Sequence, residues 1–396
     1  MPQIKDWIPA LTGMMCFALG AGLIGVYGFF AEHLAREFDV GLATINIGPV
    51  ALLLVPGLVG PLIGKLVDRV PIRRIMLTGA TIAMLSLCVS GSANSLVLAA
   101  VGFVGFSLGL SMYGPVVVNG LLIKLYPGRE ARALAFAAMG ISVATALLPP
   151  LVGLLLVSFD WRTALTMLAV GILLTLWLLI LLGIPANAGV ASGDPATPKT
   201  DINIYGQRSF WLVGICVALV LNTAIILAIC YPPHFTSQGY SVAQAGLFIS
   251  VAGIAGLFGK TVLAVFAESV SRHTKAVAIG LIAGQAIGLG LLLVVTGVGQ
   301  TLLVLCLAGA CSGGFIPMHP YLNSRYFDAR IIGQVNGAQM PLFLPLGIVG
   351  APLAGYMYDQ QGHYEWVFMA LVCVLLAAIL VALFLPRANP VSTAVD

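Results

Sequence analysis

Long apolar runs separated by short polar segments follow one another along the whole chain. A helix needs about 20 predominantly apolar residues to cross a bilayer, and each run reaches that scale before charge, Gly, Pro or Asn ends it. The pattern predicts an all-α membrane protein with twelve transmembrane helices. The expected helices cover residues 8–31, 43–66, 74–94, 96–125, 131–158, 162–185, 209–231, 242–267, 275–297, 300–325, 335–357 and 366–386.

The two halves of the chain repeat each other. Asp68 and Glu268 both end the second predicted helix of their half, 200 positions apart. Asp160-Trp161 and Glu365-Trp366 match at an offset of 205. Matching residues at a nearly constant sequence separation indicate that the two halves form two related helical bundles. Such an internal repeat is typical of secondary transporters.

A polar segment separates the two halves. Residues 187–207 contain Gly, Ser, Pro, Lys and Asp without periodicity, which is typical of a flexible linker. We therefore expect a six-helix bundle at residues 1–186, a cytoplasmic linker at 187–207 and a second six-helix bundle at 208–396.

Composition supports the bilayer interpretation. Hydrophobic residues make up 60% of the chain and charged residues only 8%, whereas soluble domains carry roughly 25% charged residues. This small number of charged residues cannot cover a water-facing surface. Most of the protein surface must therefore face lipid. The net charge of +4 gives no reason to expect a nucleic-acid partner.

The placement of positive charge predicts the orientation. With both termini in the cytoplasm, fifteen of the 18 Lys and Arg residues fall on the cytoplasmic side, Arg36 and Arg162 fall outside, and Lys260 lies within a span. This bias follows the positive-inside rule. The first apolar run, residues 8–30, is too long for a signal peptide. We expect a multi-pass protein of the cell membrane, with the first span retained.

A charged loop follows the second predicted helix. The residues from Gly64 through Asp68-Arg69 to Arg73-Arg74 resemble the signature loop of the major facilitator superfamily, Gly-x-Leu-x-Asp-Arg-x-Gly-Arg-Arg/Lys-Arg/Lys, with Pro71 and Ile72 as departures. A glycine allows close helix approach, and an acid at a membrane edge can pair with cations or a helix N-terminus. An ordinary positive cytoplasmic loop is the alternative. The predicted conformational latch comprises Gly64, Asp68, Arg69, Arg73, Arg74, Glu268 and Arg272, and its second copy is degraded because Ala264 replaces the glycine.

Two further stretches narrow the resemblance to one branch. Residues 25–38 and 124–134 are similar to monocarboxylate transporters and oxalate:formate exchangers. That resemblance implies a cation in the eighth helix that binds the substrate carboxylate and stands eight residues before the acid at the end of that helix. Here Lys260 stands eight residues before Glu268. The acid that the family carries four residues earlier is replaced here by Gly256, which puts the usual proton relay in doubt.

Lys260 is also informative without any resemblance. A cation at mid-membrane costs roughly 2.5–3.5 kcal/mol on insertion scales, so it usually faces a cavity or a partner. Gly256, Gly253 and Gly246 lie on the same helix face and allow close packing or leave room for a ligand. A snorkelling lysine is the alternative. All fourteen acids lie at span ends, in loops or in tails, so the positive potential favours a small anion.

Other polar residues within spans are candidates to line the transport path. The predicted substrate-binding residues are Lys260, Tyr113, Asn119, His319, Asn222, Tyr27 and Gln339. His319 is also the candidate for proton coupling, because imidazole titrates near neutral pH. Interhelical hydrogen bonding explains each polar residue equally well when taken alone, and Tyr27 fits an interfacial anchor.

Together these features predict a monomeric secondary active transporter that moves a small, monocarboxylate-like organic anion by alternating access, with proton symport as one option and no cofactor. A drug or other small-molecule proton antiporter is the nearest alternative, although residues 144–153 retain only one of the four glycines in its fifth-helix signature. No enzyme motif appears among the scattered histidines. The seven cysteines lie in apolar stretches without the spacing of a metal site or disulfide framework.

Overall fold

The computed structural model describes residues 4–40, 45, 48–189 and 203–386, and every regular element in them is helical. The chain forms two compact units. The first unit contains residues 1–127, 136–200 and 327–341, and the second contains 128–135, 201–326 and 342–396. Each unit therefore includes a short segment from the other half of the sequence. The predicted linker at 187–207 overlaps residues 190–202, which lie outside the described residues, so the predicted boundaries stay a prediction.

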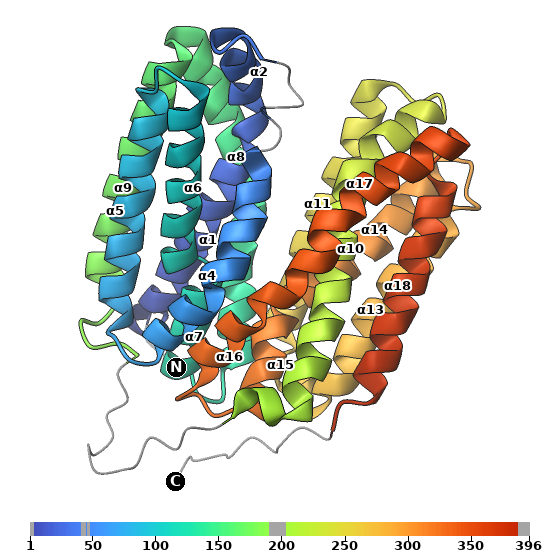
Figure 1. Ribbon diagram of the computed structural model, residues 1–396. Coiled ribbons are helices and arrows are strands. Elements are labelled where there is room, and N and C mark those ends of the chain that lie inside the picture. The colour runs from blue at the N-terminus through green and yellow to red at the C-terminus, as the bar shows by residue number, and fades with distance from the viewer. Residues whose placement is uncertain (1–3, 41–44, 46–47, 190–202, 387–396) are drawn as a thin grey trace. The chain divides into compact units, whose positions relative to one another are not determined.

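The first unit is built mainly from the N-terminal half (Figure 1). Its helix α5 packs between α6 and α9. The elements are η1 (Ile4–Trp7), α1 (Ile8–Gly25), α2 (Tyr27–Glu37), η2 (Gly48–Val50), α4 (Ala51–Val67), α5 (Ile72–Gly91), α6 (Leu96–Tyr113), α7 (Pro115–Leu125), most of α8 (Glu130–Ser158), α9 (Trp161–Gly183) and α16 (Ile332–Ala338).

The second unit is built mainly from the C-terminal half. Its helix α18 packs on both α10 and α13, and α11 packs along α14. The elements are η3 (Ile204–Gly206), α10 (Arg208–Ser237), α11 (Val242–Val265), α12 (Ala267–Arg272), α13 (Thr274–Leu292), α14 (Val298–Phe315), α15 (Met318–Tyr326), α17 (Leu344–Gln361) and α18 (Glu365–Leu383), with η4 (Met340–Phe343) divided between the units.

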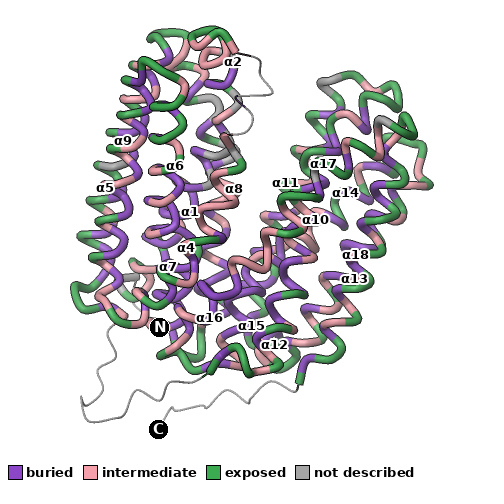
Figure 2. The backbone as a smooth tube through the Cα atoms, viewed as in Figure 1, coloured by how far each residue is buried: buried purple, intermediate pink, exposed green. Residues whose placement is uncertain are grey.

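Many of these helices have the length and apolarity of membrane spans. In the described part of the chain, nine helical segments qualify: Ile72–Gly91, Leu96–Leu125, Trp161–Gly183, Arg208–Ser237, Gln244–Val265, Thr274–Leu292, Val298–Phe315, Ile332–Tyr358 and Glu365–Leu383. Shorter apolar helices cover Ile8–Gly20 and Ala51–Val67. Within each unit, buried residues lie mainly where helices pack and exposed residues on the remaining faces (Figure 2). The architecture is an all-helical, multi-span fold.

Local sequence signals set several helix ends. The Asp160 carboxylate accepts hydrogen bonds from the backbone N–H groups of Arg162 and Thr163 at 2.9 and 3.1 Å and so begins α9. Ser241 and Gln244 form a reciprocal capping box at the start of α11. These side chains satisfy backbone donors that the first helical turn leaves open.

Two predicted spans are broken near their middle. The span 96–125 stops at Gly114 (φ −87°, ψ −153°), and Pro115 begins α7. The span 300–325 is interrupted after α14, and α15 begins directly after Pro317. Proline disfavours helical geometry in the residue before it and supplies no N–H. The two breaks occupy related places in the two halves, an arrangement that points to a binding site in transporters.

Candidate functional site

Asp68 lies directly after α4 and caps another helix of the first unit. Its carboxylate accepts hydrogen bonds from the backbone N–H groups of Gly333 (3.1 Å) and Gln334 (2.6 Å) at the start of α16. The Lys124 ammonium lies 2.9 Å from the same carboxylate. A negative charge at a helix N-terminus satisfies open N–H groups and opposes the positive end of the helix dipole. The latch acid thus holds a segment that comes from the other half of the sequence.

A seam of glycines brings α4 and α16 close together. A Cβ atom on Gly64 would overlap the backbone carbonyl of Gly333, and one on Gly60 would lie 2.9 Å from the carbonyl of Gly337. Real Cβ atoms essentially never approach a backbone atom so closely. The seam therefore requires glycine on both helices, and it sets the distance at which Asp68 reaches α16.

Lys124 is a contact residue that the motif alone did not single out. Besides the ion pair, its ammonium donates to the backbone carbonyls of Val67 (2.9 Å) and Gly189 (3.2 Å). Burial raises the pKa of the Asp68 carboxyl above its ordinary value of 3.8, while Lys124 and the two backbone N–H groups act to lower it. The sequence feature that could have identified Lys124 as a contact residue is its position at the end of the fourth predicted span.

The remaining basic residues of the first latch copy lie outside this contact. Arg69 and Arg74 are exposed and Arg73 is half-buried. Within the described residues, none of the three makes an ion pair or side-chain hydrogen bond. The contact therefore depends on Gly64, Asp68 and Lys124.

The second latch copy has a different structure. Glu268 and Arg272 lie on α12 and are both exposed. In the part of the chain that the structure describes, neither side chain forms an ion pair. The nearest equivalent of the first contact is a long hydrogen bond, 3.4 Å, from Arg132 Nε to the backbone carbonyl of Ala264.

Lys260 lies within α11 and is only 3% exposed. It is the most deeply buried Lys, Arg, Asp or Glu side chain of the described residues. A snorkelling ammonium would reach water, so this burial weighs against snorkelling.

The glycine face beside Lys260 has two parts. Gly256 packs against α14, where an added Cβ would lie 3.2 Å from the carbonyl of Gly309. Gly253 and Gly246, further toward the N-terminus of α11, have nothing described within 4 Å of such a Cβ. Helical side chains generally lean toward the helix N-terminus, which is the direction in which this less crowded part lies.

Asn222 and His319 approach the same residue in the second unit. The Asn222 amide donates to the backbone carbonyl of Phe343 at 3.0 Å, and the His319 ring meets the Phe343 ring edge-on at a centroid distance of 5.6 Å. The amide oxygen of Asn222 is buried with no hydrogen-bond partner among the described residues. Phe343, absent from the predicted residues, thus links helix α10 to the break before α15.

The other predicted residues lie in the first unit. Tyr113 is fully buried at the end of α6, and its hydroxyl has no hydrogen-bond partner in the described structure. Asn119 lies on α7 and is 9% exposed, and Gln339 ends α16 and is fully buried. Tyr113 and His319 therefore flank the two helix breaks, one in each half.

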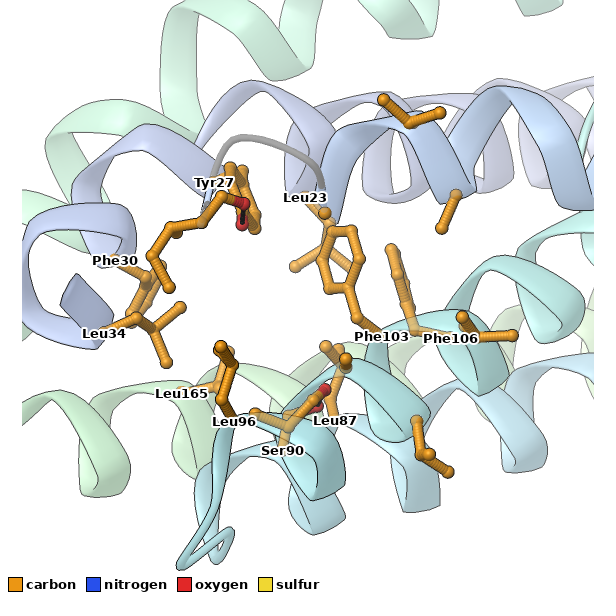
Figure 3. A pocket seen from close by; sticks show the side chains of 18 of the residues that line it. Leu23, Tyr27, Phe30, Leu34, Leu87, Ser90, Leu96, Phe103, Phe106 and Leu165 are labelled. Carbon is orange, nitrogen blue, oxygen red and sulfur yellow. Dashed lines mark hydrogen bonds between the residues drawn. The ribbon is translucent and has the colours of Figure 1, made fainter. Parts of the chain in front are cut away.

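Tyr27 lines a cavity of about 680 Å³ in the first unit (Figure 3). Its hydroxyl donates to the backbone carbonyl of Ile45 at 2.6 Å, and its ring lies 5.0 Å from that of Phe103. The lining is almost entirely apolar. Among the described residues, no group of three or more His, Cys, Asp or Glu side chains is arranged to hold a metal ion.

Comparisons with known proteins identify the family of the chain. The sequence profile of the Major Facilitator Superfamily matches residues 10–348 and 270–395. Monocarboxylate transporter 11 of Homo sapiens is 25% identical over 401 residues, covering 97% of this chain and 83% of the relative. Monocarboxylate transporter 13 of Rattus norvegicus is 23% identical over 386 residues, covering 96% of this chain and 89% of the relative.

Solved structures show the same fold. The proton:xylose symporter XylE matches with a TM-score of 0.76 at 15% identity, over 96% of both chains. The E. coli fucose:proton symporter FucP matches with a TM-score of 0.74 at 14% identity, over 97% of this chain and 98% of that one. The profile match extends over most of the sequence, and these relatives are transporters and not enzymes. The chain therefore belongs to the major facilitator superfamily and is a multi-pass membrane transporter.

Proposed function

We propose that this protein is a secondary active transporter of a small, monocarboxylate-like organic anion. The observation that carries the proposal is the deep burial of Lys260 within a helix that is long and apolar enough to span the membrane. A buried cation in a bilayer costs roughly 2.5–3.5 kcal/mol on insertion scales, and such residues mark substrate and ion pathways. An anionic substrate would offset that cost while it is bound.

The surroundings of Lys260 support a small carboxylate. Gly256 occupies the place of the family's eighth-helix acid and packs against α14. Gly253 and Gly246 leave less crowded space along the same helix face. Relatives named monocarboxylate transporters match nearly the whole chain, and a carboxylate is the shared chemistry of the substrates that this name describes.

Polar groups near the helix breaks complete the proposed binding set. Asn222 offers a buried amide oxygen without a partner among the described residues, and Tyr113 offers a hydroxyl in the same condition. We assign substrate contacts to these groups together with Asn119 and Gln339, and proton coupling to His319, because an imidazole can exchange a proton near neutral pH. Tyr27 lines the apolar cavity of the first unit, so we assign it the role of an interfacial anchor.

Alternating access would use the latch contact of the first unit. We propose that Asp68, held at the start of α16, stabilises one conformation and releases α16 in another. The nine described spans, the two shorter apolar helices and the 29-residue α8 support a count of twelve. The charge bias supports cytoplasmic termini. We propose a monomer with six-helix bundles at 1–186 and 208–396.

Counterflow in proteoliposomes tests the proposed function. Vesicles containing the purified protein are preloaded with an unlabelled short monocarboxylate, and entry of the labelled acid is followed. We expect saturable counterflow for short monocarboxylates and none for a neutral hexose or an organic cation. Counterflow of the cation alone would instead support a drug antiporter.

A further inference from the structure

The cavity of the first unit is distinct from the region around Lys260. It lies among α1, α2, α4, α5, α6 and α9, and Figure 3 shows Tyr27 and Phe30 on one side of it and Ser90 and Leu96 on another. Its volume of about 680 Å³ is typical of ligand sites, which span roughly 300–1,000 Å³. Close-packed protein interiors contain few voids larger than a water molecule.

The lining offers a ligand almost no polar group. Tyr27 and Ser90 supply the two side-chain hydroxyls, and both already donate to backbone carbonyls, Tyr27 to Ile45 at 2.6 Å and Ser90 to Ala99 at 3.0 Å. All other lining side chains are aliphatic or aromatic. Since neither hydroxyl has a proton left to donate, a polar solute would lose most of its hydration without compensation. The cavity selects for hydrocarbon.

One side of the cavity is open along α6. Val97, Val101 and Val104 line it and are 75, 60 and 47% exposed. Their spacing of four and three residues places them on one helix face. An apolar stripe that stays exposed on a spanning helix is chemically suited to contact lipid chains. This stripe would give the hydrocarbon of the bilayer a route into the cavity.

Charged groups of both signs lie beyond one end of the cavity. Arg162 precedes the lining residue Leu165 by one helical turn, and Glu37 follows the lining residue Leu34 by one turn. The Arg162 guanidinium lies 2.8 Å from the Glu37 carboxylate, and both side chains are partly exposed, at 29 and 43%. Arg162 also donates to the carbonyl of Gly91, next to the lining residue Ser90, at 2.9 Å. The pair presents a cation and an anion together at the end of a predicted span.

We propose that this cavity binds one acyl chain of a zwitterionic membrane phospholipid. The chain enters past the valine stripe of α6 and fills the apolar space. The headgroup lies over the partly exposed Arg162–Glu37 ion pair, with its phosphate beside the guanidinium and its ammonium beside the carboxylate. The proposal rests on family membership and on the cavity, and it does not depend on the transported substrate.

Photo-crosslinking tests the site. The purified full chain is placed in nanodiscs that contain a phosphatidylethanolamine with a diazirine near the end of one acyl chain, and crosslinked peptides are mapped by mass spectrometry. We expect labelling to concentrate on residues 96–106 at least fivefold above Leu174, Leu178 and Leu182, which are exposed at 63, 59 and 76% on α9. Even labelling of both helices would overturn the proposal.

Paired variants on α6 test whether the crosslinked acyl chain lies inside the cavity. Ala100 lines the cavity, whereas Leu98, on the same helix and 41% exposed, does not. Ala100→Phe is expected to reduce the labelling of α6 at least fivefold, and Leu98→Phe to leave it unchanged. Ala51→Phe fills the cavity from α4 and provides a second blocking variant. Unchanged labelling in both blocking variants would exclude the cavity as the binding site.

Headgroup variants separate a phospholipid from a free fatty acid. Arg162→Gln with Glu37→Gln is expected to lower labelling by the phospholipid several-fold. A diazirine fatty acid with the same chain should label the wild-type protein more weakly than the phospholipid. Equal or stronger labelling by the fatty acid would overturn the assignment to a phospholipid.

Discussion

Three positions, spaced four residues apart on the second predicted helix, correspond between the two halves but hold different residues. The positions hold Gly60, Gly64 and Asp68 in the first half and Lys260, Ala264 and Glu268 in the second. In the first half, the glycines allow α4 to meet α16, and the acid caps that helix. In the second half, the first position holds a buried cation, and the acid is exposed. The helix of the first half is therefore built for helix contact, and we propose that the helix of the second half is suited to anion binding.

The largest expected effect comes from filling the glycine seam. Gly64→Leu places a side chain where the backbone carbonyl of Gly333 lies, and overpacking of this kind costs about 1–3 kcal/mol. We expect a tenfold or greater loss of counterflow, because α16 can no longer dock on α4. Ala264→Leu, the matched change in the second half, should reduce counterflow by less than threefold. Equal losses in the two variants would contradict the difference between the helices.

A smaller effect is expected from the latch acids. Asp68→Asn removes the charge from two backbone hydrogen bonds and from the ion pair with Lys124. It also removes a buried charge whose desolvation opposes those contacts, so the net change should be about 0.5–1.5 kcal/mol. We expect a two- to tenfold change in the exchange rate, measured under equal substrate on both sides. Glu268→Gln should leave the rate unchanged, and an equal change in both variants would argue against a single retained latch.

The two helix breaks differ in the residue that follows the proline by two positions. His319 holds this place in the second half and Val117, which is fully buried, holds it in the first. An imidazole can carry or sense a proton in the physiological range, whereas valine cannot. We expect His319→Gln to lose pH-driven accumulation while it retains counterflow. Intact pH-driven accumulation would remove His319 from proton coupling.

The smallest expected effect concerns the ends of the last helix in each half. Asp160 caps α9, whereas Glu365 begins α18 and is exposed. Hydrogen bonds from the hydroxyl and the backbone N–H of Thr163 lower the pKa of Asp160 below 3.8. Its stabilising contribution is therefore complete above pH 3.8 and disappears as the pH falls through the lowered value.

Thermal unfolding measures this difference. Asp160→Ala should lower Tm at neutral pH, and the gap from wild type should narrow in acid. Glu365→Ala should change Tm less at every pH. A gap that widens in acid would contradict the capping role of Asp160.

Sequence patterns predicted the spans better than the contacts. The length of an apolar segment identifies a membrane span, because the thickness of the bilayer sets that length. Hydropathy alone does not reveal a break within a span, such as the one at Gly114-Pro115. The Gly-Pro pair itself was the usable signal. Asp68 was predictable from its motif, whereas Lys124 and Phe343 were not, because their partners lie 56 and 121 positions away in the sequence. Such contacts depend on helix packing and not on local periodicity.

We propose that Lys260, the buried cation of the second half, binds the carboxylate of the substrate. Counterflow of a short labelled monocarboxylate, measured for wild type, Lys260→Ala and Lys260→Arg at equal protein content and equal Tm, tests it most directly. We expect at least a tenfold loss of counterflow for Lys260→Ala and substantial retention for Lys260→Arg, which keeps the charge. Wild-type counterflow in Lys260→Ala would contradict the claim.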